Sequence, residues 1–377
     1  MLTRIYIDNF RCFVNFEWKP GRKQLILGPN GSGKSSLLDA LSRLRDFAIK
    51  GGIDDLHSLS QLTRWLRFKQ SRQTFEIEAQ LGHGTYVYRL EIEPDRSPEP
   101  QPRIVWEGVK LDGRAIFDFA DGAVTLYTDS FAQKVTYPFD PRRSALATIT
   151  SMVDNQKLTE FKLWFGGFQF FRINPFSMGL RAAGERYEPS LDLSNFAEWY
   201  RHLLQNFPRE NSAFLESLRS VLDGFTFLKF MLLAGSPALS STDVLALVAE
   251  FGDQGSASAT FGFDELSEGQ RCLICLYAIL HFVVVRGFTV VLDEPENFVS
   301  LREIQPWLTA MADAVDEGKG QVLLISHHPE ILNQWAPDFG VQFVREGVGP
   351  VRVREFQGAS ESSLTPAELV ARGWELE

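Results

Sequence analysis

The chain has 377 residues, with 38 Lys and Arg against 48 Asp and Glu, which gives a formal net charge of −10. Hydrophobic residues make up 44% and charged residues 23%, values typical of a globular protein, so collagen-like, low-complexity and wholly disordered chains are excluded. A net-acidic chain is not a general nucleic-acid binder, although it can still carry a local basic face.

The chain opens with residues that alternate like strands over 2–7 and 12–18, and a short apolar strand follows at 24–27. A glycine-rich loop comes next, and apolar residues at helical spacing then predict a helix over 34–48. The loop reads Gly28-Pro29-Asn30-Gly31-Ser32-Gly33-Lys34-Ser35, which matches the phosphate-binding pattern G-x-x-x-x-G-K-[ST] (Walker A) in full.

Each part of this loop has a physical role in binding a nucleotide. Glycines let successive backbone N–H groups point at phosphate oxygens, and the start of the helix adds partial positive charge. Lys34 is expected to reach the β- and γ-phosphates of ATP, and the Ser35 hydroxyl to coordinate Mg²⁺. The predicted nucleotide-binding residues here are Asn30, Gly31, Ser32, Gly33, Lys34, Ser35 and Ser36.

The rest of the chain predicts an α/β fold. Residues 74–137 alternate as an antiparallel set of strands, and Asn195–Leu233 has helical spacing. After this we expect a helix over Glu268–Val285, a strand over Phe288–Leu292, a helix over about 301–315 and a strand over Val322–Ser326. This alternation of helices and strands predicts parallel strands in a mixed sheet. We therefore expect an N-terminal lobe (1–175), a helical insertion or lid (176–258) and a C-terminal lobe (259–377).

Acidic residues directly follow the expected strand Phe288–Leu292. Phe288–Leu292 runs into Asp293-Glu294-Pro295, which places carboxylates at the carboxyl end of a sheet strand (Walker B). Asp293 suits a ligand of the Mg²⁺ shell, and Glu294 could orient or deprotonate the attacking water. Glu296 remains an alternative to Glu294 as the base.

Two further strings carry a resemblance to a known family. Leu266-Ser267-Glu268-Gly269-Gln270 resembles the signature motif of ABC-type ATPases, and Asp293-Glu294-Pro295 resembles their magnesium and catalytic acids. Ile325-Ser326-His327-His328-Pro329 resembles their switch-histidine segment, which marks His327 as catalytic. The resemblance implies a P-loop ABC-type ATPase head that pairs head to tail as a homodimer, possibly of higher order. Ser267 and Gly269 would then act on the nucleotide of the other copy.

The opening string Ile5–Phe13 resembles the RecF, SMC and OLD branch of this family. In that branch a basic residue at this place contacts the phosphates, which makes Arg11 a nucleotide-binding candidate. The family also has a glutamine that senses Mg²⁺, and Gln169 is our candidate for it. The His327-His328 pair lacks further metal ligands nearby, and Cys272 and Cys275 are expected to pack in a helix core.

Three functions remain open at this stage. An SMC protein needs long coiled coils and an OLD nuclease a further acidic domain, and we find neither pattern. The chain resembles stand-alone AAA-family ATPase subunits of bacterial anti-phage and abortive-infection systems, which work with a separately encoded effector. The alternatives are a RecF-like DNA-repair ATPase and a nucleotide-gated scaffold that does not hydrolyse ATP.

The remaining signals concern partners and location. Arg64–Arg72 mixes basic and aromatic residues, so it could contact nucleic acid or form an amphipathic helix with a solvated face. Three cysteines are too few for a disulfide framework, and charged residues among the first twenty argue against a signal peptide. The apolar stretch 272–292 is interrupted at His281 and Arg286, so we expect no membrane span and a soluble, cytoplasmic protein.

Overall fold

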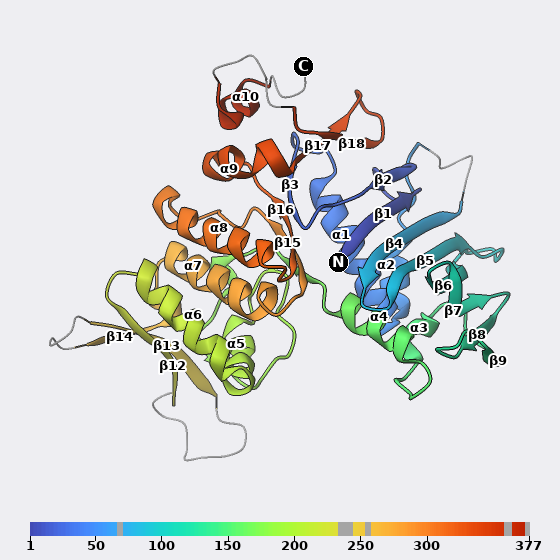
Figure 1. The fold of residues 1–377 in the computed structure, drawn as a ribbon, viewed down its shortest axis with the longest axis horizontal. Coiled ribbons are helices and arrows are strands. Elements are labelled where there is room, and N and C mark those ends of the chain that lie inside the picture. Colours follow the sequence, from blue (N-terminus) through green and yellow to red (C-terminus); the bar gives the residue numbers. More distant parts are fainter. Residues whose placement is uncertain (66–70, 233–243, 253–257, 358–363, 374–377) are drawn as a thin grey trace. The chain divides into compact units, whose positions relative to one another are not determined.

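The computed structural model describes residues 1–65, 71–232, 244–252, 258–357 and 364–373 (Figure 1). The chain forms two compact units. Unit 1 contains Met1–Gln169 and Trp335–Ser363, and unit 2 contains Phe170–Gln334 and Leu364–Trp374. The predicted division at residues 175 and 258 stays a prediction.

An antiparallel sheet of eight strands dominates unit 1, which confirms the expected antiparallel region (Figure 1). Strands β4 and β5 alternate buried and half-buried side chains in their central parts, as expected where one face of a sheet packs on helices. In order across the sheet they are β2 (Phe16–Trp18), β1 (Leu2–Asp8), β4 (Gln73–Leu81), β5 (Gly84–Pro94), β6 (Pro102–Leu111), β7 (Arg114–Ala120), β8 (Ala123–Tyr127) and β9 (Gln133–Pro138).

Helices pack on this sheet in unit 1 (Figure 1): three of them contact its strands, and α1 (Lys34–Lys50) packs on those three. Aromatic side chains fill the space between the layers: Tyr88 on β5 stacks on Phe161 at 5.9 Å between ring centroids, and Phe165 packs on the same ring. The four helices are α1 (Lys34–Lys50), α2 (Ile53–Leu59), α3 (Ala145–Thr148) and α4 (Gln156–Gly166).

Unit 1 buries one acidic side chain under these helices. Glu107 on β6 is fully buried and accepts hydrogen bonds from Tyr88 Oη at 3.1 Å, Ser144 Oγ at 2.5 Å and the Ala145 backbone N–H at 2.9 Å. Burial raises the pKa of Glu107 to about 7, and these hydrogen bonds only partly oppose that rise. Glu107 therefore binds its proton more tightly in the folded than in the unfolded chain.

This pKa shift predicts a pH-dependent stability. The stabilising contribution of the protonated Glu107 is fully present below about pH 4.5 and is lost as the pH rises to about 7, at a cost of about 3 kcal/mol. We expect Glu107→Gln to flatten the fall in the free energy of unfolding across this range, measured by chemical denaturation. The exposed Glu99→Gln should leave the profile of the wild type unchanged. An identical slope in Glu107→Gln would contradict the prediction.

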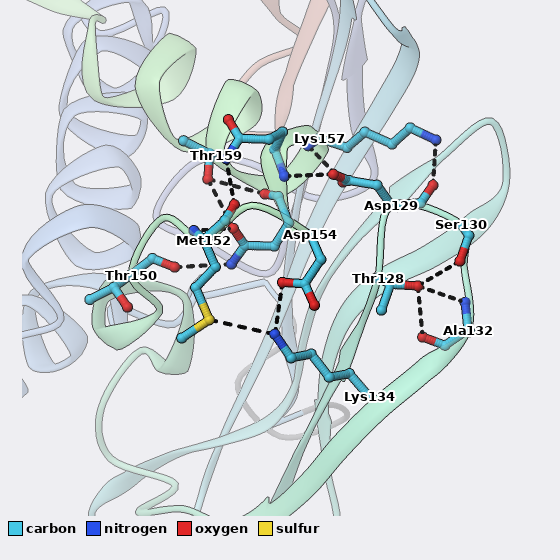
Figure 2. A network of polar contacts seen from close by, with 12 residues as sticks. Thr128, Asp129, Ser130, Ala132, Lys134, Thr150, Met152, Asp154, Lys157 and Thr159 are labelled. Carbon is cyan, nitrogen blue, oxygen red and sulfur yellow. Dashed lines mark hydrogen bonds and ion pairs between the residues drawn. The ribbon is translucent and has the colours of Figure 1, made fainter.

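A polar network fixes the start of α4 (Figure 2). The Asp129 carboxylate, on the loop between β8 and β9, accepts the backbone N–H groups of Gln156 and Lys157, each at 2.9 Å. Lys157 Nζ donates to the Asp129 carbonyl at 2.7 Å, and Lys134 pairs with Asp154 at 2.7 Å. Asp129 thus caps a helix that begins 27 residues later in the chain.

Three further strands belong to unit 1. β3 (Lys23–Leu27) pairs in parallel with β17 (Gly340–Arg345), which pairs antiparallel with β18 (Val351–Glu355). Gln24 Nε2 donates to the Phe339 carbonyl across 315 residues of sequence. Four of the five β3 residues are buried, as an interior strand requires.

Unit 2 combines helices with parallel and antiparallel strands. β15 (Thr289–Asp293) and β16 (Gln321–Ile325) are parallel and fully buried, which confirms the predicted α/β class. A separate antiparallel sheet contains β11 (Arg181–Ala182), β13 (Leu245–Phe251), β12 (Phe225–Leu232) and β14 (Ala259–Gly262).

The helices of unit 2 are amphipathic or wholly buried. α7 (Glu268–Ile279) is buried from Arg271 to its end, and it continues into a π-helical turn at Leu280–Val284. The other helices are α5 (Phe196–Asn206), α6 (Pro208–Val221), α8 (Leu301–Asp316) and α10 (Pro366–Arg372). The short strand β10 (Gln169–Phe171) and the helix α9 (Pro329–Phe339) contain the points where the chain passes between the units.

The expected helical content of 195–233 is partly wrong. Helices end at Val221, Gly224 adopts a left-handed φ of 72°, and β12 follows. The aromatic and β-branched residues of Phe225-Thr226-Phe227 favour a strand once the glycine has ended the helix. The predicted strand over 12–18 is likewise shorter, because Asn15 has a left-handed φ of 45° and only Phe16–Trp18 is extended.

No helix within the described part of the chain is both long and apolar enough to cross a membrane.

Candidate functional site

The loop after β3 has the backbone shape that phosphate binding needs. Gly28 has a φ of 140°, and a Cβ there would lie 2.4 Å from the Phe343 carbonyl oxygen, so only glycine fits. Gly31 and Gly33 also have positive φ values, of 78° and 104°. The chain therefore turns sharply enough for its N–H groups to face inward.

The side chains of this loop fit a phosphate group. Lys34 is only 7% exposed, and its Nζ donates to the Gly28 and Pro29 carbonyl oxygens at 2.5 and 3.2 Å. Ser32 is 2% exposed, and among the described residues its hydroxyl oxygen has no hydrogen-bond partner. A buried hydroxyl without a partner is costly, and a phosphate oxygen would accept its hydrogen bond.

The start of α1 adds to this fit. Gly33 is the N-cap residue, and within the described residues no side chain caps the helix or places an acid in its first turn. A phosphate there would therefore meet the positive end of the helix dipole with no competing carboxylate in that turn. A Cβ on Gly33 would lie 2.7 Å from Val351 Cγ2 and 3.0 Å from Cys12 Sγ, so a side chain there would push the loop away from its support.

Two arginines flank the phosphate loop in unit 1. Arg11, with a left-handed φ of 47°, pairs with Asp39 of α1 at 2.6 Å and donates from Nε to Gln61 at 2.6 Å. Arg345 donates to the Gly31 carbonyl at 3.0 Å and stacks over the Trp65 ring at 5.2 Å. Arg11 is thus held at the loop by a carboxylate, and its predicted contact with phosphates stays a prediction.

A second group of predicted residues gathers at the ends of β15 and β16 in unit 2. Asp293 is the last residue of β15 and is 5% exposed. Arg172 donates to Asp293 Oδ2 from both Nε and Nη2, at 2.9 and 2.6 Å. The guanidinium thus offsets the charge of a buried carboxylate at a position suited to a metal ligand.

Glu294 and Glu296 differ sharply in their surroundings. Glu294 is half-buried, has a left-handed φ of 48°, and accepts a hydrogen bond from Asn297 Nδ2 at 3.2 Å. Glu296 is only 6% exposed, and its Oε1 accepts the Ser326 hydroxyl hydrogen at 2.5 Å. Burial raises the pKa of Glu296 to about 7, and the negative charge of Glu294 adds to the rise.

The signature-like string begins α7 in unit 2. Ser267 Oγ accepts a hydrogen bond from the Gln270 backbone N–H at 3.2 Å, and Gln270 Oε1 accepts one from the Ser267 backbone N–H at 3.0 Å. A Cβ on Gly269 would lie 2.8 Å from the Phe298 carbonyl oxygen, so glycine is required there. Ser267 is exposed on the surface of this unit.

The remaining predicted residues are placed as follows. His327 is exposed directly after β16, whereas Gln169 is half-buried at the start of β10. Cys272 and Cys275 are buried in α7. Residues 66–70 of the basic segment Arg64–Arg72 lie outside the described residues, and Arg72 pairs with Glu91 and Glu93.

Sequence reasoning missed Arg172 and Ser326 as partners of the acids. Arg172 follows the apolar pair Phe170-Phe171 as Asp293 follows the apolar run 288–292, and a charge after an apolar run was the available signal. The pairing itself joins residues 121 positions apart, which a local pattern does not reveal.

Two family models match separate parts of the chain. Residues 4–164 match a model described as "AAA domain", and residues 251–333 match one described as "AAA domain, putative AbiEii toxin, Type IV TA system". The mycobactin import ATP-binding/permease protein IrtA of Mycobacterium tuberculosis is 30% identical over 106 residues, which are 27% of this chain. The match spans 12% of that protein's length.

A solved SMC head structure shares the fold at low sequence identity. An SMC head bound to the C-terminal winged-helix domain of ScpA superposes with a TM-score of 0.56 at 11% identity, covering 94% of this chain and 98% of that one. The SMC head domain from Thermotoga maritima gives a TM-score of 0.46 at 12% identity, with 95% and 99% covered.

Proposed function

We propose that this chain, an ABC/SMC-like AAA ATPase that resembles abortive-infection ATPases, is a nucleotide-driven switch that controls a partner protein. In this proposal it binds and hydrolyses MgATP, pairs head to tail with a second copy, and passes the closing motion to a separately encoded effector in anti-phage defence. The phosphate loop carries the proposal, because its buried Ser32 hydroxyl and its Lys34 ammonium both suit a phosphate ligand.

The proposed roles follow from the chemistry of each side chain. Mg²⁺ would offset the charge that develops on the phosphates during transfer. Lys34 would bind the phosphates, and Ser35, Asp293 and Gln169 would supply the metal ligands. Arg172 would keep the Asp293 carboxylate oriented through its two hydrogen bonds to Oδ2.

The remaining proposed roles concern the attacking water and the second copy. Glu294 would take the proton of the water, because its half-exposed carboxylate follows directly after Asp293 and carboxylates act as general bases. His327 would help to position the groups that react. The exposed Ser267 would contact the nucleotide bound by the second copy.

Partner control has separate support. One matching family description names a toxin of a type IV toxin–antitoxin system, and the SMC head of similar fold was solved with a domain of ScpA. ATP would shift the chain between open and closed states by its differential affinity for them. We propose in addition that the lid segment 176–258 contacts the effector.

Phosphate release tests the proposed function. We expect the wild type to release phosphate from MgATP, and Lys34→Ala to bind a fluorescent ATP analogue about 100-fold more weakly, because about 3 kcal/mol of charge-assisted hydrogen bonding is lost. Light scattering should show a doubled mass for the wild type with MgATP, and Ser267→Arg should prevent it.

The controls separate this function from its alternatives. Lys50→Ala at the far end of the same helix α1, where Lys50 pairs with Asp46, should bind the analogue like the wild type. Absence of phosphate release in the wild type, or unchanged binding in Lys34→Ala, would contradict the ATPase proposal. A strong increase in turnover on adding duplex DNA would instead favour the RecF-like alternative over effector control.

A further inference from the structure

We infer that Glu296 is a positioning residue that ties the loop carrying His327 to the turn carrying Glu294, and that it does not act as the general base. This inference deepens the proposed function and rests on it for its catalytic meaning. The tie itself is a structural statement about unit 2, and it can be tested in the absence of nucleotide.

A chain of hydrogen bonds links the two segments. Ser326 is fully buried, and its hydroxyl donates to Glu296 Oε1. The same Ser326 oxygen accepts the backbone N–H of His328 at 3.0 Å. Because His327 lies between these two residues, the Glu296 carboxyl group fixes both sides of the segment that presents the His327 side chain.

The backbone places Glu296 at this point. The Glu294 backbone N–H donates to the Ile325 carbonyl at 2.8 Å, which brings the end of β15 beside the end of β16. The left-handed conformation of Glu294 then turns the chain, and the Val299 N–H donates to the Glu296 carbonyl at 2.9 Å. This turn directs the Glu296 side chain inward and leaves Glu294 half-exposed.

The surroundings of Glu296 do not suit a general base. Its Oε1 already accepts the Ser326 hydroxyl hydrogen, and its Oε2 is buried with no hydrogen-bond partner among the described residues. A base needs hydrogen-bond reach to the water that it deprotonates.

The inference predicts that an amide can replace this carboxyl group. Gln keeps an oxygen that accepts the Ser326 hydrogen bond, so Glu296→Gln should keep kcat within about threefold of the wild type. Glu296→Ala and Ser326→Ala should each lower kcat about 10-fold or more with KM nearly unchanged, because a misplaced catalytic loop slows chemistry without weakening ATP binding. The double variant should be no slower than the slower single variant.

Hydrogen exchange supplies a readout that needs no turnover. In nucleotide-free protein, Glu296→Ala and Ser326→Ala should speed amide exchange in a peptide covering 324–332, because the His328 N–H loses its fixed acceptor. Glu296→Gln should exchange like the wild type. Glu330→Ala, which removes a carboxylate from the same segment without touching Ser326, is the matched control and should also exchange like the wild type.

Two results would overturn the inference. One is a loss of turnover in Glu296→Gln with exchange unchanged, which would make Glu296 the base. The other is wild-type exchange in Glu296→Ala and Ser326→Ala, which would remove the tie. If the wild type releases no phosphate, the proposed function fails, and the exchange measurement still decides whether Glu296 holds this loop.

Discussion

Replacing Glu294 by Gln is expected to lower ATP turnover by about 100-fold or more while ATP binding stays within about threefold of the wild type. Glu294 follows the buried strand β15, and its carboxylate is half-exposed and bonded only to Asn297 among the contacts described for it. An amide keeps the shape and this contact but cannot accept a proton. The variant should therefore bind MgATP and fail to consume it.

A trapped ATP state gives this prediction a second readout. Light scattering should show that Glu294→Gln keeps the doubled mass with MgATP after the wild type has exhausted its ATP and returned to the smaller mass. Glu303→Gln on α8 is the control and should turn over like the wild type, because the Glu303 carboxylate bonds to Ser300 at the helix cap and Gln can keep that contact. Full turnover in Glu294→Gln would remove Glu294 from the proposed mechanism.

Trp307→Ala is expected to lower the free energy of unfolding by about 5 kcal/mol. Trp307 on α8 is the largest of the fully buried side chains, and its Nε1 donates to the Leu276 carbonyl of α7 at 3.0 Å. Truncation would leave a cavity between two helices of unit 2 and a carbonyl without this donor. Urea denaturation followed by circular dichroism measures the loss.

Two comparisons separate the packing of Trp307 from its hydrogen bond. Trp307→Phe keeps most of the volume and loses the N–H donor, so it should cost about 1–2 kcal/mol. Leu301→Ala lies on the same helix but is 60% exposed, and it should cost less than about 0.5 kcal/mol. A Trp307→Ala loss as small as that of Leu301→Ala would show that α8 does not depend on this packing.

Local patterns in the sequence predicted the parts of the site that depend on neighbouring residues. The phosphate loop is set by glycines at positions with positive φ, and the buried strand before Asp293 is a run of apolar residues. Both signals lie within about ten residues, so one stretch of sequence contains them. The capping of α7 by Ser267 is local for the same reason.

Contacts between distant residues could not be predicted in this way. Arg172 reaches Asp293 across 121 residues, and Ser326 reaches Glu296 across 30. Strand β12 was missed because the helical spacing before Gly224 continued into aromatic residues that also suit a strand. The choice between helix and strand there is decided by pairing with β13, which lies beyond any local window.

The discontinuity of unit 1 also bears on how the protein is made. β3, which leads into the phosphate loop, has its parallel neighbour β17 about 315 residues further along the chain, as the Gln24–Phe339 contact shows. During synthesis on the ribosome, that edge of β3 stays unpaired until about 315 further residues have been made. An open strand edge can pair wrongly, so β3 is exposed to misfolding until β17 has been made. The same delay leaves the phosphate loop without the Arg345 contact to Gly31 until β17 has been made.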